Sequence, residues 1–294
     1  MFEVYAFLAM FTAQIVVFTV LHPMKLIGRV RARLTRYPAE RFPQLYPHGS
    51  EGVERQLKVH RLLNASIAVA GVGLLAWFFS YMRRPDWDDG PVETLVSLFF
   101  ALQLIPVMLF MLATARTNKV LRRSFREETR KAVFERRSVF DFVSPFVVFV
   151  TLLCYPLFVA FVIYLEQNPF PGFAGAYVNI GVVTALYAVT ALCVYASLYG
   201  KKVNPLQTHA DRMRTIDVAV KVCIYSCLAI VAFLSLNFSL VTFDLQHWEP
   251  LAHSAFLVIF ALLYLNWLES GLTGLPSELD LERLRSNPVS SAAR

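Results

Sequence analysis

The stretch FVSPFVVFVTLLCYPLFVAFVIYL, residues 142–165, runs for 24 residues without an Asp, Glu, Lys or Arg. The same property is shared by the stretches 4–24, 62–82, 94–115, 167–200, 222–243 and 250–268. A bilayer has a hydrocarbon core of about 30 Å, and a helix rises ~1.5 Å per residue, so each stretch can cross it. The sequence therefore predicts an all-α membrane protein with seven transmembrane helices.

The composition agrees with a chain whose main solvent is lipid. Of its 294 residues, 56% are hydrophobic, and the mean hydropathy is +0.51. A soluble domain could not bury that much apolar surface. The first stretch follows the acidic Glu3 and lacks a small-residue cleavage site, so we expect it to be a retained span rather than a signal peptide.

Basic residues lie mainly at one end of the predicted helices. The connections 23–61, 116–140 and 200–221 and the tail after Gly271 hold 26 of the 28 Lys and Arg residues. Because Lys and Arg are enriched in cytoplasmic loops, we expect the N-terminus outside and the C-terminus in the cytoplasm. This predicts a multi-pass protein of a plasma membrane of the bacterial inner-membrane type. Residues 1–271 would form the membrane domain, and 272–294 a short cytoplasmic tail.

The first basic connection has the pattern of an amphipathic helix. In PMKLIGRVRARLTRYP, residues 23–38, Ile27 and Val30 fall on one helical face, and Arg29 and Arg33 on the other. Such a helix is suited to lying along an anionic cytoplasmic leaflet. We therefore expect membrane lipids as partners, anionic ones at the cytoplasmic face, rather than nucleic acid. The sequence leaves open a protein partner or a homo-oligomer.

Three similar strings precede the second, fourth and sixth predicted spans. They are ERQLKVH (54–60), ERRSVFD (135–141) and DRMRTID (211–217), each with an acid, then Arg, and His or Asp at its end. The pattern suggests a three-fold hairpin repeat with one extra helix, as internal repeats are common in transport folds. The helix dipole and the retention of basic residues in the cytoplasm are the alternative cause.

Polar residues inside the predicted spans are the first candidates for a site, because placing them in lipid is unfavourable. Gln103 lies three residues before Pro106, and Pro156 interrupts the next span. A proline frees a carbonyl and kinks its helix, which favours a central cavity near Gln103. A kink that only shapes helix packing is the alternative. The candidates for this cavity are Gln103, Pro106, Pro156, Asn179, Tyr187, Asn237 and Asn266. We expect Gln103 to face the interior and to contact one of the deep polar side chains, a water or a ligand.

Small residues on the second predicted span indicate a close helix contact. Ser66, Ala70 and Gly73 recur at helical spacing. Small side chains allow helix backbones to approach one another in membranes, so this stripe is predicted to pack against a neighbour.

A second set of candidates lies at the predicted cytoplasmic interface. It comprises Arg55, His60, Arg136, Asp141, His209, Asp211, Arg212 and Asp217. No pair of these residues has the spacing of a known metal motif, so no metal site is predicted, and ion pairs with the many arginines explain them. Nucleophile, phosphate-binding and metalloprotease motifs are absent. We therefore assign no catalytic residue, and the sequence does not specify a cofactor.

The string ERQLKVH-RLLN, Glu54 to Asn64, is similar to the Glu-Arg…Arg-x-His…Asn signature of the membrane-associated eicosanoid and glutathione metabolism proteins. The resemblance implies a glutathione site built from Arg55, Lys58, His60 and Asn64. It covers eleven residues; Lys58 replaces Arg, Asn64 lies one position late, and an expected acid is missing. Seven predicted spans also exceed the four of that family, so we do not assign the chain to it.

Three functions follow from these patterns. The first is a non-enzymatic membrane protein that binds or passes a small solute or lipid through a kinked-helix cavity. The second is a membrane-embedded transferase that holds an anionic cofactor of the glutathione or phosphate type at the cytoplasmic interface. The third is a scaffold or sensor subunit of a larger complex.

Overall fold

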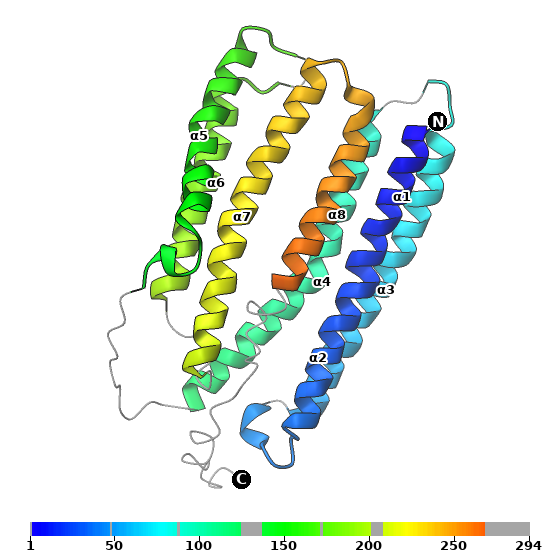
Figure 1. Ribbon diagram of the computed structural model, residues 1–294. Helices are drawn as coiled ribbons and strands as arrows, with labels where there is room; N and C mark the ends of the chain where they lie inside the picture. The colour runs from blue at the N-terminus through cyan, green and yellow to red at the C-terminus, as the bar shows by residue number, and fades with distance from the viewer. Residues whose placement is uncertain are drawn as a thin grey trace.

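The computed structural model describes residues 2–47, 49–86, 89–124, 137–170, 173–200 and 208–267, and these residues form helices with no strand among them. The long elements are shown in Figure 1: α1 (Phe2–Val16), α2 (His22–Arg36), α3 (Gly49–Tyr81), α4 (Asp89–Ser124), α5 (Pro145–Glu166), α6 (Ala176–Tyr199), α7 (His209–Thr242) and α8 (Glu249–Trp267). The predicted all-α class is therefore confirmed.

Six helices within the described ranges are long and apolar enough to cross a membrane. They are Phe2–Arg36, Gly49–Tyr81, Gly90–Leu121, Pro145–Glu166, Ala176–Tyr199 and His209–Thr242. The seventh predicted span coincides with α8, which is helical over 19 residues but is not among these six. The helices are long and apolar enough for a multi-pass membrane protein, while the count of seven spans and the orientation stay predictions.

The first span is longer than the bilayer requires because α1 continues into α2. The two helices are joined by a π-helical segment, Val17–Leu21, and Pro23 occupies the first turn of α2. A run of 35 residues extends over about 50 Å, well beyond the hydrocarbon core. The expectation that residues 23–38 lie along the membrane surface is therefore wrong, since α2 projects along the axis of α1 (Figure 1).

The apolar face of α2 explains why it does not lie flat. Leu26, Ile27 and Val30 are buried in one cluster with Leu57 of α3 and Phe110 of α4. These side chains are covered by protein and so need no lipid to cover them. The first basic connection is thus largely a helical extension of the bundle.

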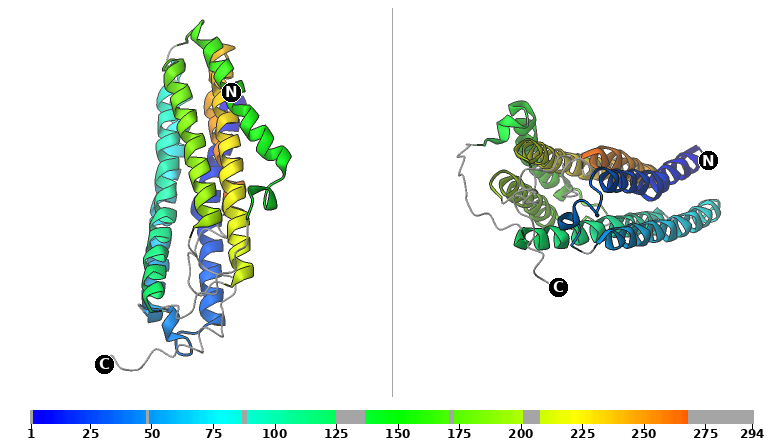
Figure 2. Two further views of the ribbon diagram at one scale, coloured as in Figure 1. Left: turned by 90° about the vertical axis from the view of Figure 1, so that its left-hand side faces the viewer. Right: turned by 90° about the horizontal axis from the view of Figure 1, so that it is seen from below.

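The helices form two groups. In the larger group, α1 packs on α3 and α8, and α4 packs on α3 and α8; in the smaller group, α5, α6 and α7 pack on one another. The groups meet through a contact between α7 and α8. Seen end-on, α1, α8 and α7 lie in one row, with α3 and α4 in a second row beside it (Figure 2).

Aromatic rings fill the core of the larger group near the end that carries the N-terminus. The ring of Phe11 lies 5.0 Å from that of Phe78 and 5.4 Å from that of Phe99, in edge-on and tilted arrangements. Aromatic pairs with these geometries stabilise beyond the area they bury. At the same end, Nε2 of His247, in the turn before α8, lies 3.6 Å from Oε1 of Glu3 in α1.

The close approach of helices in this core depends on Gly71. A Cβ at this position would lie 2.6 Å from Cζ of Phe99 and 3.0 Å from Cδ1 of Ile15. The predicted stripe of Ser66, Ala70 and Gly73 lies on another face of α3 and is exposed, and a Cβ on Gly73 would meet no atom within 4 Å. The prediction that this stripe packs against a neighbouring helix is therefore wrong for the described fold, and the packed face of α3 is that of Gly71.

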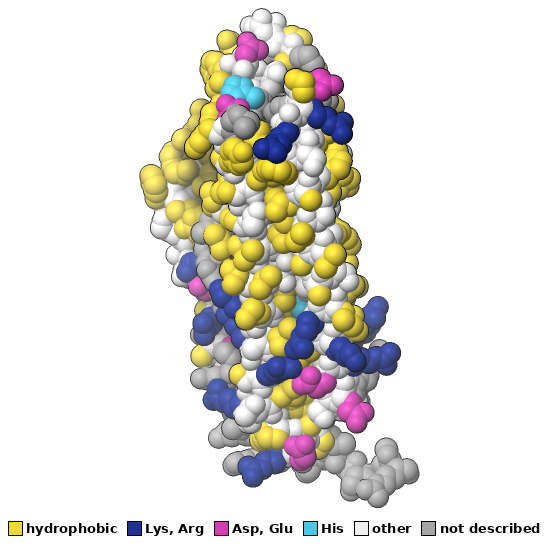
Figure 3. All heavy atoms as spheres, turned by 90° about the vertical axis from the view of Figure 1, so that its right-hand side faces the viewer, with side chains coloured by type: hydrophobic (Ala, Val, Ile, Leu, Met, Phe, Trp, Pro, Cys, Tyr) yellow, Lys and Arg dark blue, Asp and Glu magenta, His cyan; other side chains and the backbone are white. Residues whose placement is uncertain are grey.

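Charged side chains are segregated along the long axis of the bundle. Figure 3 shows most Lys and Arg side chains, with some acids, at the lower end, apolar side chains over the length above them, and a smaller group of acids, basic side chains and a His at the upper end. The face in Figure 3 thus has a charge-poor length between charged ends, as a membrane-spanning bundle requires.

The three-fold repeat is not confirmed and stays a prediction. The first and third strings lie inside α3 and α7, but the second ends in a 3₁₀ turn, Val139–Asp141, that precedes α5. The chief neighbours of α4 are α3 and α8, and those of α5 are α6 and α7. Therefore the expected hairpin of α4 and α5 does not form a closely packed pair like that of α6 and α7.

Candidate functional site

Buried polar side chains are concentrated in the larger helix group. Gln14, His22, His60, Asn64 and Gln103 are each at most 3% exposed and come from α1 to α4. Polar groups buried in a membrane bundle must find partners inside it, because lipid offers none. The larger helix group is therefore the part of the described fold in which most buried polar side chains lie.

Gln103 faces the interior, as expected, but its partner was not foreseen. Nε2 of Gln14 in α1 donates to Oε1 of Gln103 in α4 over 3.0 Å. The partners expected from the sequence were Asn179, Tyr187, Asn237 or Asn266, or a water or a ligand. In the described part of the chain, the hydrogen bond of Gln103 is made with Gln14.

His60 and Pro106 connect α3 to α4 one helical turn further along. Nδ1 of His60 lies 3.3 Å from the carbonyl oxygen of Pro106. Since a carbonyl can only accept, Nδ1 carries the hydrogen and donates it. Nε2 of His60 is buried and has no partner among the described residues, and the ring of His22 lies 6.4 Å away. Asn64 anchors the same turn, donating through Nδ2 to the carbonyl of His60 over 2.7 Å.

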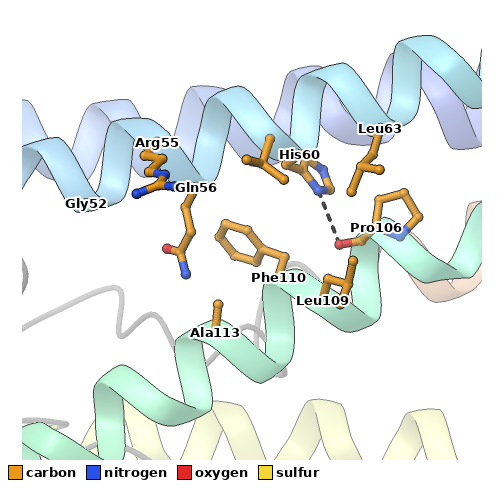
Figure 4. Close-up of a pocket in the computed structure, with 10 residues that line it drawn as sticks. Gly52, Arg55, Gln56, His60, Leu63, Pro106, Leu109, Phe110 and Ala113 are labelled. Atoms are coloured by element: carbon orange, nitrogen blue, oxygen red, sulfur yellow. Dashed lines mark hydrogen bonds between the residues drawn. The ribbon is translucent and has the colours of Figure 1, made fainter.

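A crevice opens between α3 and α4 beside this contact. It has a volume of about 320 Å³ and is lined by Gly52, Arg55, Gln56, Val59, His60, Leu63, Pro106, Leu109, Phe110 and Ala113. Figure 4 shows the two helices close at His60 and Pro106 and further apart toward Gly52 and Ala113. We call this space the α3–α4 crevice.

Pro106 lies at the narrow end of the crevice. Its ring takes the place of an amide hydrogen, so the carbonyl of Leu102 loses its usual donor and α4 can bend there. Beyond the bend, α4 diverges from α3, and apolar side chains from both helices face the gap (Figure 4). The crevice therefore begins at the proline and widens toward the basic end of the bundle.

A smaller and more polar space adjoins the crevice. It has a volume of about 70 Å³ and is lined by Val30, Arg33, Leu34, Leu45, Tyr46, Val53, Gln56, Phe110, Thr114, Thr117 and Asn118. Gln56 and Phe110 line both spaces, and they project toward each other from α3 and α4 in Figure 4. We call the smaller space the Arg33 chamber.

Several predicted cavity residues lie elsewhere. Pro156 is exposed on α5, and Nδ2 of Asn179 bonds to the carbonyl of Gly175 in its own helix. The hydroxyl of Tyr187 donates to the carbonyl of Thr151, within the smaller group. Oδ1 of Asn237 is buried on α7 without a described partner. The side chain of Asn266 lies outside the described residues. Among the cavity candidates whose side chains are described, Pro106 alone lines the crevice.

The interface candidates are also dispersed. Arg55 and His60 line the crevice, but Oδ2 of Asp141 accepts from the amide of Ser138 and Oδ1 of Asp217 pairs with Lys221 at 2.7 Å. Arg212 donates to the carbonyl of Gly200 over 3.0 Å. His209 and Asp211 lie in the first turn of α7, and Arg136 is outside the described residues. No three His, Cys, Asp or Glu residues of the described ranges gather where they could hold a metal.

The site implied by the glutathione-protein resemblance is not assembled. Of its four residues, Arg55 and His60 line the crevice, while Asn64 is buried against its own helix. Lys58 is exposed and does not line the crevice. The short string therefore does not converge on one ligand.

Sequence reasoning missed Gln14 and His22 as buried polar residues of the bundle, and Arg33 as a residue that lines the chamber. Gln14 and His22 are the polar side chains within and at the end of the first predicted span, so the intramembrane polarity that singled out Gln103 could have identified them. Arg33 was counted with the other basic residues of its segment, and no local signal separates it from them.

Comparisons of the chain with protein-family models, with curated proteins and with solved structures found no match.

Proposed function

We propose that this is a non-enzymatic, multi-pass membrane protein that binds a lipid or a small apolar solute in the α3–α4 crevice. The observation that supports the proposal is the crevice itself, a space of about 320 Å³ lined mainly by apolar side chains. Ligand sites in proteins are concave, mostly apolar and about 300–1,000 Å³ in volume, with a few polar groups that orient the ligand. Arg55, Gln56 and His60 are the polar groups here.

The surroundings of the crevice favour a ligand that arrives from the membrane. Leu62 on α3 is 58% exposed, and Leu112 on α4 is 54% exposed, so the helices that form the crevice also carry apolar side chains on the surface. In a membrane these side chains contact acyl chains. A lipid or apolar solute would thus enter laterally without crossing water.

The proposed setting follows from the charge distribution. We place the basic end in the cytoplasm of a cell with a bacterial-type inner membrane, because Lys and Arg are retained on that side. Binding at this depth would serve either storage of the ligand or its passage between the bilayer and the cytoplasmic interface. A transferase is less well supported, because the residues proposed for it are dispersed over α3, α7 and the 3₁₀ turn before α5.

Mass spectrometry of small molecules and lipids that co-purify with the protein tests the proposal. Val59→Trp fills the crevice and should remove the bound species. The control is Val69→Trp, since Val69 is 74% exposed on the same helix away from the crevice. Equal recovery of the same molecules from both variants would overturn the proposal, provided that both retain the thermal transition of the wild type.

A further inference from the structure

Arg33 in the wall of the chamber has an unusual environment. Its side chain is half-buried, and its Nε atom is fully buried with no hydrogen-bond partner among the described residues. Among the described residues that line the chamber, it is the one charged side chain. A buried N–H donor is unfavourable unless an acceptor satisfies it, and a bound anion is an acceptor that would also balance the charge of the guanidinium.

The neighbouring groups provide acceptors and donors but no negative charge. Burial raises the pKa of the Tyr46 phenol, so it stays protonated, and its hydroxyl donates to the carbonyl of Tyr37 over 2.7 Å. Thr114 donates to the carbonyl of Phe110, and Thr117 to that of Ala113. The described side chains that line the chamber thus offer no negative charge to balance Arg33.

The chamber and the crevice form two parts of one amphipathic site. They share Gln56 and Phe110, and the chamber lies on the side of the basic helical extensions, while the crevice reaches toward the charge-free length of α3 and α4. An anionic headgroup at Arg33 would therefore sit at the level of the membrane interface. A hydrocarbon chain attached to it would run past Phe110 into the crevice.

Resting on the function proposed above, we infer that the ligand is an anionic amphiphile with a carboxylate or phosphate monoester head, held by Arg33, and a hydrocarbon tail in the crevice. The planar guanidinium suits both heads, because it can offer two parallel N–H donors to an oxyanion. Arg55 stands exposed at the crevice and provides a second, weaker attraction.

Photolabelling of the full chain in uncharged detergent micelles separates binding of a hydrocarbon tail in the crevice from binding of an anionic head at Arg33. The probes are a photoactivatable long-chain fatty acid and the matching fatty alcohol, with cross-links mapped by mass spectrometry. For the wild type we expect labelling of crevice residues, such as Val59 and Leu109, and a preference for the acid of about tenfold or more, as charge-assisted hydrogen bonds provide. In Arg33→Gln, labelling by the acid should fall to that by the alcohol, while labelling by the alcohol is unchanged.

Matched variants show whether the charge and the donor geometry of Arg33 cause the preference for the acid. Arg31→Gln removes an exposed charge from the same helix and should keep the preference for the acid, whereas Arg33→Lys, which keeps the charge but loses the fork of donors, should give an intermediate value. An unchanged preference in Arg33→Gln, or no preference in the wild type, overturns the inference and leaves the proposed function standing. Absence of labelling by both probes overturns both. Inorganic phosphate should compete with the acid for Arg33 and leave labelling by the alcohol unchanged; a loss of alcohol labelling in phosphate would overturn the inference.

Discussion

Gln14 and Gln103 share one hydrogen bond, from Nε2 to Oε1 at 3.0 Å, although two side-chain amides can form two. Oε1 of Gln14 and Nε2 of Gln103 are buried and have no partner within the described ranges. The pair therefore joins α1 to α4 but leaves a donor and an acceptor unmatched. Gln103 does not line the α3–α4 crevice, so this pair is part of the packing rather than of the proposed ligand site.

The first prediction concerns this amide pair. Gln103→Leu leaves Gln14 with no partner, and we expect the free energy of unfolding to fall by about 1–3 kcal/mol. The double change of Gln14 and Gln103 to Leu removes every unmatched group and should restore or exceed the wild-type stability. Thermal unfolding of the four proteins in detergent gives the coupling energy. Additive losses in the double variant would show that the two amides do not stabilise each other.

The second prediction compares two glycines of α3. Gly71→Ala forces a methyl group against Phe99 and Ile15, and such overpacking should lower the free energy of unfolding by about 1–3 kcal/mol. Gly73→Ala meets open space and should be neutral or slightly stabilising, because Ala has the higher helix propensity. Both are measured by thermal unfolding. Equal effects of the two changes would contradict the packing described for α1, α3 and α4.

The third prediction tests the role of Pro106 in opening the crevice. Pro106→Ala restores an amide donor to the carbonyl of Leu102, so α4 should straighten and the crevice should narrow. Spin labels at the exposed positions Glu51 and Ala115 report the distance between the diverging ends of α3 and α4. We expect a shorter distance in Pro106→Ala and no change in Pro156→Ala, a proline exposed on α5. A distance insensitive to Pro106 would assign the divergence to other contacts.

The fourth prediction tests orientation. A cysteine placed at Gln246, exposed in the turn between α7 and α8, should react with a membrane-impermeant reagent from outside the cell. A cysteine at Ser50, exposed at the start of α3, should react only after the membrane is opened. The native cysteines are replaced in both proteins. Labelling of the Ser50 position from outside would reverse the proposed topology.

The helices could be predicted from the sequence because the exclusion of charge from lipid acts on each segment alone. Residues 142–165, for example, correspond to α5 to within three residues at each end. The straight path of α2 could not be predicted in this way, because it depends on contacts with Leu57 and Phe110, which are remote in the chain. An amphipathic pattern shows that a face will be covered, but not whether lipid or protein covers it.

The candidate site could be predicted only in part, because local patterns are visible in the sequence and contacts between remote residues are not. Pro106 was identified because a proline inside a span has a local consequence, and it does border the crevice. The buried position of Gln103 was also expected, but its hydrogen bond to Gln14 joins residues 89 positions apart. Arg33 looks like its neighbours in the sequence, and only the packing of α2, α3 and α4 distinguishes it from the exposed Arg31.

The π-helical segment Val17–Leu21 determines the angular setting of α2. A π-helical turn holds one more residue than an α-helical turn, so one residue inserted into an α-helix rotates everything after it by about 100°. Deleting one residue here, such as the exposed Val20, would let a continuous α-helix form and would turn Arg33 away from its chamber by that angle. The charge that faces the ligand space is thus controlled by chain length a dozen residues upstream, independently of any side chain that lines it.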